Sequence, residues 1–141
     1  RLSRELDIAV CSPEHAPGGI FSRAEWVLQG AADMSRIDVG YGGITGSYKH
    51  AMLCQAYGIK CEMHGGHWTN SHILGATPES TCEYFERGLL RPDLEYDKPE
   101  PYLKAIADPL DEDGNVILAS APGLGMEFNW DYIEENRIST D

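Results

Sequence analysis

The fold of this chain is predicted by the stretch 37-IDVGYGGITGSYKHAMLCQAYGIKCEMHGG-66, which reads as the end of a buried strand, a helix and a second buried strand. Gly42-Gly43 favours a turn, and Thr45 or Ser47 is a suitable N-cap for the helix that follows. Gly58 suits the position just past the helix end. A strand, a helix and a strand within about 25 residues predict a parallel βαβ unit.

Similar short strands precede and follow this unit. Four apolar segments are predicted to be buried strands: 7–11, 34–37, 59–63 and 81–85. Helices are predicted between them: one opened by a capping box from Ser22 to Glu25 and ending near Gly30, the helix of the βαβ unit, and a short helix over 72–76. Strands that alternate with helices in this way favour a parallel α/β fold.

A polar residue follows each predicted strand, in the order Glu14, Asp38, His64 and Glu86. These residues are 24, 26 and 22 positions apart. The carboxyl ends of parallel barrel strands meet at one rim, where barrel enzymes place their catalytic groups. The spacing is typical of half a (β/α)8 barrel. Because a whole barrel needs roughly 250 residues, we expect the chain to be part of a longer polypeptide.

The last 40 or so residues follow a different pattern. A connector rich in proline and charge runs from Arg91 to Pro101, so we divide the chain into residues 1–101 and 102–141. In the second part, segments 102–106 and 116–118 flank the turn signal Asp113-Gly114 and predict a small hairpin. Asn129 is a suitable cap for a final short helix.

The composition excludes some classes of partner. The 141 residues contain 11 Lys and Arg against 23 Asp and Glu, a formal net charge of -12. This balance argues against nucleic acid and anionic membrane surfaces as partners. Four cysteines without a CxxC pair predict reduced thiols in a cytoplasmic protein. No apolar run approaches the length of a membrane span, and no signal peptide is visible.

The four rim residues have catalytic and structural interpretations. Asp38 beside His64 would fix one imidazole nitrogen and make the other a general base, but a buried histidine satisfied by a neighbouring aspartate is equally compatible with the spacing. Glu14 is either a metal ligand or a polar residue near a helix start. Glu86 either exchanges a proton or pairs with a neighbour such as Arg87.

Other site chemistries have weaker support. The residues His64, His67 and His72 are close in sequence, but their spacing matches no established zinc pattern. The glycines of VGYGGITG do not form GxGxxG, although they could open an anion-binding helix terminus. Ser12 and Cys61 lack the context of a nucleophile elbow, which argues against covalent catalysis.

The 37–66 stretch, together with APGLGMEFNWDYI near the end, resembles the C-terminal half of the enolase superfamily, in the mandelate racemase-like branch of the mandelate racemase/muconate lactonizing enzyme family. The resemblance covers nearly the whole chain and rests on GGITG, the following helix, the histidine after the next strand and PGLG. It implies a modified (β/α)7β barrel capped by an α+β domain. Residues 1–101 would supply strands five to eight, and residues 102–141 would pack against the capping domain.

The same resemblance implies a role for each rim residue. Glu14 matches the third carboxylate ligand of a Mg²⁺ ion, and Asp38 with His64 matches a catalytic dyad. Glu86 matches the glutamate that hydrogen-bonds the substrate carboxylate. Lys49 and Lys60 are not placed to replace the dyad, which argues against the muconate-lactonizing type. The first two metal ligands and the lysine-bearing strand are expected outside these residues.

The function implied by this resemblance is Mg²⁺-dependent dehydration of a sugar acid. A base removes the proton α to the carboxylate, an enolate forms and the β-hydroxyl is lost; the divalent ion stabilises the developing charge. Protonated Glu86 would add a hydrogen bond at the same charge. One alternative is a racemase or epimerase of a 2-hydroxy acid, which needs a second base. Another is a non-catalytic family member. We expect a small-molecule carboxylate as substrate and a homo-oligomer.

Overall fold

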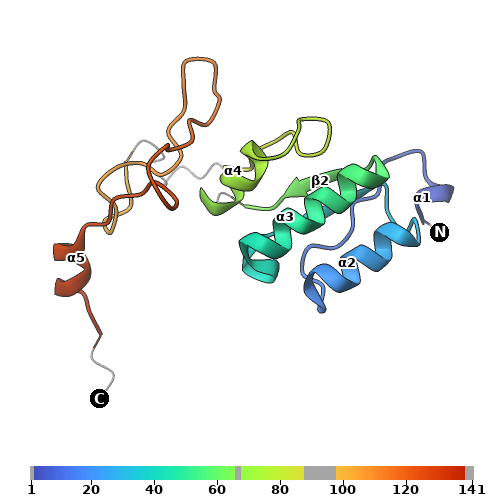
Figure 1. Ribbon diagram of the computed structural model, residues 1–141, viewed down its shortest axis with the longest axis horizontal. Coiled ribbons are helices and arrows are strands. Elements are labelled where there is room, and N and C mark those ends of the chain that lie inside the picture. The colour runs from blue at the N-terminus through green and yellow to red at the C-terminus, as the bar shows by residue number, and fades with distance from the viewer. Residues whose placement is uncertain (1, 66–67, 88–97, 139–141) are drawn as a thin grey trace. The chain divides into compact units, whose positions relative to one another are not determined.

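The computed structural model describes residues 2–65, 68–87 and 98–138 (Figure 1). Its contacts divide the chain into two units, residues 1–88 and 89–141, and each is described by itself. Most of the predicted connector lies outside the described residues, as does His67 of the zinc alternative. The division at residue 101 and the packing against a capping domain therefore stay predictions.

The first unit is built around a parallel βαβ motif. Its elements are α1 (Leu2–Glu5), α2 (Gly19–Leu28), β1 (Met34–Ile37), α3 (Val39–Tyr57), β2 (Lys60–Met63) and α4 (Trp68–Gly75). β1 and β2 pair in parallel, with Met34 opposite Lys60 and Ile37 opposite Met63. α3 connects the two strands and contacts both, with α2 alongside it (Figure 1). The predicted βαβ unit is confirmed.

The outer segment before β1 is not the strand that was predicted over residues 7–11. Cys11 makes only an isolated parallel bridge to Met34, supported by the Ser12 N–H donating to the Met34 carbonyl at 3.0 Å. The carboxylate of Asp33 accepts the Val10 N–H at 2.7 Å and so removes a donor from the potential ladder. The segment still lies beside β1, where a neighbouring barrel strand would run.

The outer segment after β2, residues 81–85, is likewise not a regular strand. The Cys61 N–H donates to the Thr81 carbonyl at 2.7 Å, which places this segment beside β2. The Thr81 N–H instead donates to the Pro78 carbonyl at 2.8 Å, because residue 81 still belongs to the turn after α4. The spatial order of the four segments therefore follows the predicted order, although only the central pair forms a sheet.

Three predicted helix starts are wrong. α2 begins at Gly19 after Gly18 (φ 90°), so Ser22 lies inside its first turns and donates to the Pro17 carbonyl instead of capping. α4 begins at Trp68, four residues before the predicted start, and ends at Gly75. The chain enters α2 directly from the turn at Gly18.

The third correction concerns α3, which begins at Val39 and is capped by Asp38, whose Oδ1 accepts the Gly40 N–H at 2.8 Å. Thr45 and Ser47 therefore lie within the helix. The predicted glycine turn survives as a break at Gly43 (φ 63°, ψ 176°), a conformation that is nearly restricted to glycine. Gly58 ends α3 with φ 67°, as predicted.

The core of the first unit lies between the sheet and the helices. In both strands every second residue is buried, which directs Ser35, Ile37, Cys61 and Met63 toward the core. They meet side chains of α3 and α4 and the segment after α4: Ala51, Cys54, Ile73 and Cys82. The alternate residues, such as Arg36 and Glu62, border a hollow of about 470 Å³. Each strand thus directs one face toward the core and the other toward this hollow.

Over residues 98–138, the second unit contains two antiparallel bridges and one helix. Leu110 pairs with Val116 around the predicted Asp113-Gly114 turn, whereas Leu103 pairs with Phe128 and not with residues 116–118. The predicted hairpin is therefore shorter than expected and begins after 106. The final helix, α5 (Trp130–Glu135), is confirmed, with Asn129 Oδ1 accepting the Tyr132 N–H at 3.4 Å.

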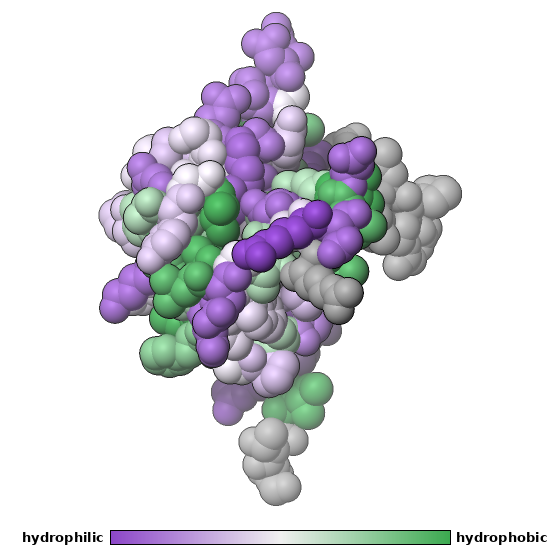
Figure 2. Space-filling view, turned by 90° about the vertical axis from the view of Figure 1, so that its right-hand side faces the viewer, coloured by the Kyte–Doolittle hydropathy of each residue, from purple (hydrophilic) through white to green (hydrophobic). Residues whose placement is uncertain are grey.

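Large apolar side chains reach the surface of both units, among them Phe21, Leu28 and Trp130. Figure 2 shows such side chains interspersed with polar ones on one side of the molecule. The cysteines are free thiols, of which Cys11 alone is exposed. Within the described ranges, no helix has the length and hydropathy of a membrane span.

Candidate functional site

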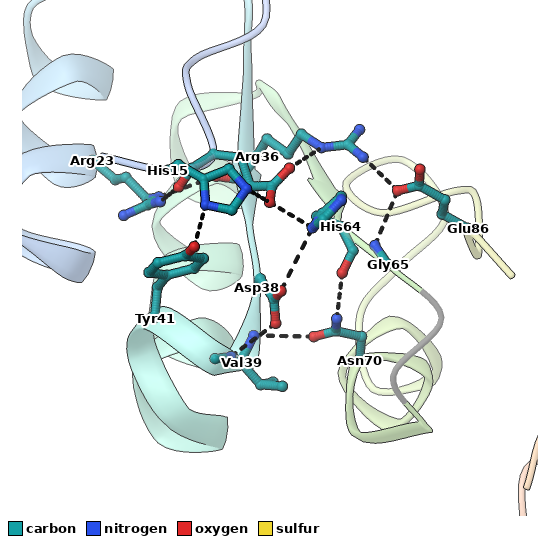
Figure 3. A network of polar contacts seen from close by, with 12 residues as sticks. His15, Arg23, Arg36, Asp38, Val39, Tyr41, His64, Gly65, Asn70 and Glu86 are labelled. Carbon is teal, nitrogen blue, oxygen red and sulfur yellow. Dashed lines mark hydrogen bonds and ion pairs between the residues drawn. The ribbon is translucent and has the colours of Figure 1, made fainter. Parts of the chain in front are cut away.

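Two adjacent strand ends position the central pair of the site (Figure 3). Asp38 directly follows β1 and caps α3, and His64 directly follows β2. The strand register places Ile37 opposite Met63, and the His64 N–H donates to the Ile37 carbonyl at 2.9 Å. The two side chains therefore leave the sheet at the same rim, as predicted.

The three groups Glu14, Asp38 and His64 form one cluster, with ligand atoms all within 4.8 Å of one another. His64 Nδ1 lies 2.6 Å from Glu14 Oε1 but 3.6 Å from Asp38 Oδ2. The carboxylates are largely buried, with 12% and 10% of their side chains exposed, against 33% for His64. The imidazole is thus nearer to the predicted metal ligand than to its predicted dyad partner.

Glu86 joins the rim through two contacts. Its Oε2 atom pairs with Arg36 Nη2 and accepts the Gly65 N–H at 3.0 Å. The Gly65 hydrogen bond, together with the charges of Arg36 and His64, lowers the pKa of the Glu86 carboxyl below its ordinary value. The predicted hydrogen bond from a protonated Glu86 is therefore disfavoured, because its surroundings stabilise the ionised form.

Arg36 connects two of the predicted residues and was not identified from the sequence. Its Nε atom lies 3.4 Å from Glu14 Oε2, while Nη2 pairs with Glu86. Residues two positions apart in a strand point to the same face, so the spacing of Arg36 from Asp38 is the signal that could have found it. One cation thereby links the segment before β1 to the segment after β2.

Asn70 of α4 ties together the backbones that carry the central pair. Its Oδ1 accepts the Val39 N–H at 3.2 Å and its Nδ2 donates to the His64 carbonyl at 2.6 Å (Figure 3). The Asn70 residue is fully buried. Nothing in the 64–72 sequence separates this asparagine from an ordinary helix residue, because its role depends on two loops distant in sequence.

The segment carrying Glu14 is held by further polar contacts. Buried Arg23 donates to the Glu14 carbonyl and, at 3.1 Å, to the Arg36 carbonyl. His15 places Nε2 2.8 Å from Glu14 Oε1 and contacts the Tyr41 hydroxyl through Nδ1. The Glu14 carboxylate is therefore surrounded by His15, Arg36 and His64, and its position is fixed by α2.

The cluster fits one part of a magnesium site. Glu14 Oε1 is buried beside His15 Nε2 and His64 Nδ1, and within the described part of the chain neither contact has hydrogen-bond geometry, so this carboxylate can offer an oxygen ligand to a cation. Mg²⁺ prefers carboxylate oxygens, whereas imidazole suits zinc and other transition metals. Glu14, and not His64, is therefore the side chain suited to a magnesium ion.

The enolase C-terminal domain-like family matches residues 1–132. D-glucarate dehydratase from Agrobacterium tumefaciens, complexed with magnesium, is 45% identical over 98% of this chain and 36% of that chain, with a TM-score of 0.91. No curated protein matches this chain.

Two less similar structures support the fold alone. An enolase from Bradyrhizobium, complexed with magnesium and mandelic acid, is 24% identical over 98% of this chain and 35% of that chain, with a TM-score of 0.69. A mandelate racemase/muconate lactonizing enzyme from a marine actinobacterium in complex with magnesium is 22% identical over 98% of this chain and 37% of that chain, with a TM-score of 0.72. The chain spans about a third of the length of these proteins. It belongs to the mandelate racemase/muconate lactonizing enzyme family of the enolase superfamily and has the fold of its C-terminal barrel half.

Proposed function

We propose that this chain forms part of a Mg²⁺-dependent dehydratase that acts on a sugar acid. The observation that carries the proposal is the 45% identity, over 98% of the chain, to a D-glucarate dehydratase complexed with magnesium. The geometry supports it, because a histidine and three carboxylates meet at one rim. The substrate class is a small carboxylate bearing a β-hydroxyl.

Glu14 would hold the magnesium ion, together with ligands supplied from outside these residues. When bound, the ion supplies Lewis-acid stabilisation for negative charge that develops on the substrate carboxylate. Its ligand in this chain is already ordered, since Arg23 holds the Glu14 backbone and Arg36 approaches the Glu14 carboxylate at 3.4 Å.

His64 is the base in this proposal. Both of its contacts with Glu14 and Asp38, the carboxylates placed nearest to it, run through Nδ1. Nε2 is therefore the atom that takes the α-proton, and the neighbouring negative charges stabilise the resulting imidazolium. The carbon–oxygen bond at the β-position then breaks, and His64 returns the proton to the departing hydroxyl as water forms.

Glu86 and Asn70 position this base. Glu86 accepts the Gly65 N–H, and Asn70 donates to the His64 carbonyl, so the residue and its neighbour are held from two sides. The Gly65 N–H, with the charge of Arg36, lowers the pKa of Glu86, and Arg36 presents a cation beside the rim. We propose that this cation contributes to binding the anionic substrate.

The test is turnover by the intact protein with Mg²⁺ on a panel of sugar acids, followed by proton NMR in D₂O. A dehydratase yields a 2-keto-3-deoxy product with one deuterium at C3. A racemase or epimerase instead returns the 2-hydroxy acid with inverted configuration and deuterium at the α-carbon. Neither product nor exchange across the panel, in a folded protein that binds Mg²⁺, would favour the non-catalytic alternative.

A further inference from the structure

A second cluster of ligand-type side chains lies in the core, away from the rim. His50 and Cys54 stand one turn apart on α3, and Cys61 faces them from β2. Each of the three residues is at most 2% exposed. Their ligand atoms all lie within 4.8 Å of one another, and His50 Nε2 is 3.4 Å from Cys54 Sγ.

This spacing suits a shared metal ion. For zinc–sulfur and zinc–nitrogen bonds of ordinary length, two ligand atoms of a tetrahedral site are roughly 3.5–3.8 Å apart. The His50–Cys54 pair is already close to this separation, and the 4.8 Å limit for the other pairs requires shifts of about 1 Å at most. Positions i and i+4 of a helix share one face, so the backbone supports this arrangement.

A fourth donor is available in the same layer. Ser35 Oγ lies 2.7 Å from His50 Nε2, and Cys82 belongs to the same buried core cluster as Cys61. Both residues are buried, with 2% and 3% exposed. Three thiols, an imidazole and a hydroxyl thus replace the aliphatic side chains that usually fill a helix–sheet core.

The convergence of donor atoms in this layer favours a cation. His50 directs Nε2 toward Cys54 Sγ and Ser35 Oγ, so the donor atoms of the cluster face one another inside the core. Buried thiolates are unfavourable without a compensating cation, and a bound metal ion would remove that cost.

We propose that His50, Cys54 and Cys61 bind a thiophilic divalent d10 cation, Zn²⁺, in the core between α3 and the sheet. Two thiolates neutralise the double charge of this ion, so no net charge is buried. Soft sulfur ligands select against Mg²⁺, which prefers oxygen. This site would stabilise the fold and is independent of the proposed function, because its ligands point away from the rim face that carries Arg36.

The test uses Co²⁺ as a spectroscopic probe in the intact protein, prepared by refolding with Co²⁺ in a phosphine reductant. We expect one equivalent of Co²⁺ and a sulfur-to-metal charge-transfer band in the near ultraviolet. Cys54→Ser should weaken the band, because it removes one of the two proposed thiolate ligands. The matched controls, Cys11→Ser and Glu14→Gln, should retain it, because Cys11 is an exposed thiol and Glu14 belongs to the rim site.

The wild-type protein decides the question even if Cys54→Ser fails to fold. Zn²⁺ refolded with the wild type should co-purify at one equivalent by native mass spectrometry and raise the melting temperature relative to the chelator-treated protein. A folded wild type that shows no charge-transfer band and no retained Zn²⁺ would overturn the proposal. A band of undiminished intensity in folded Cys54→Ser would also overturn it, because Cys54 would then contribute no thiolate to the metal.

Discussion

His64 Nδ1 lies 2.6 Å from Glu14 Oε1, so the predicted base and the predicted metal ligand are direct neighbours. Both atoms are buried, and the contact lacks hydrogen-bond geometry. Asp38, at 3.6 Å from the same nitrogen, provides a second carboxylate. A cation held by Glu14 would leave Asp38 as the carboxylate available to orient the imidazole. The carboxylate that contacts His64 Nδ1 is therefore expected to depend on whether Glu14 holds a cation.

His64→Asn should abolish exchange of the substrate α-proton, because asparagine cannot accept a proton near neutral pH. We expect kcat to fall by about 10²–10⁴-fold, which is the usual contribution of a general base. Solvent deuterium exchange into the substrate measures the loss, and a melting curve of the same preparation checks the fold. Wild-type exchange in a stable variant would show that His64 is not the base.

Glu14→Gln should weaken Mg²⁺ binding by the protein, because a neutral amide replaces the buried carboxylate. Isothermal calorimetry of Mg²⁺ addition measures the change. Glu83→Gln is a matched control, since Glu83 pairs with Lys60 and lies outside the rim cluster. Equal Mg²⁺ affinities for the two variants would exclude Glu14 as a ligand.

Glu86→Gln should change how the free energy of unfolding depends on acid pH. In the folded protein the Glu86 pKa is lowered from 4.5, mainly by the Gly65 N–H. Ionised Glu86 therefore stabilises the fold at pH values above 4.5. This stabilisation is lost as the pH falls through the lowered pKa of the folded state. The difference in unfolding free energy between wild type and variant should therefore become smaller as the pH is lowered from about 6 to about 3.

Urea denaturation at each pH measures that difference for Glu86. Glu134→Gln serves as the control, because the Glu134 side chain is 67% exposed in the second unit. A constant difference across the pH range would contradict the assignment of the lowered pKa to Glu86.

Asn70→Ala should destabilise the protein by about 1–3 kcal/mol, because the Val39 N–H loses its acceptor in a buried region. The His64 carbonyl loses a donor as well, so kcat should also fall if His64 is the base. Urea denaturation and turnover together measure the effect. Asn115→Ala, in an exposed turn, is the comparison; a similar loss of kcat there would argue against a positioning role for Asn70.

Local patterns were sufficient to predict the centre of the fold. The strands and helix around Asp38 and His64 follow from apolar runs and glycine positions within one stretch. The outer segments could not be predicted in detail, because Asp33 and Pro78 take backbone donors that a strand would use. Whether a neighbouring segment forms a regular strand depends on such side-chain and turn contacts, which an apolar run does not reveal.

The sequence predicted which residues form the candidate site, but it did not predict which of them contact one another. Because the carboxyl ends of parallel strands meet at one rim, Glu14, Asp38 and His64 were expected to lie together. This argument could not show that the imidazole lies nearer to Glu14 than to Asp38. Arg36 and Asn70 were missed because each acts across segments that are distant in sequence. Long-range contacts of this kind require the tertiary structure.

The strand register that places Ile37 opposite Met63 determines both the burial of the strand side chains and the alignment of Asp38 with His64. A slip of one residue between β1 and β2 would turn the buried side chains of one strand outward and its charged ones inward. The same slip would displace Asp38 from His64 by roughly 3.3 Å, the rise of one strand residue. A kinetically trapped chain with this error would therefore be unstable and inactive at once. Proteases and chaperones that remove unstable chains would consequently remove the inactive ones too.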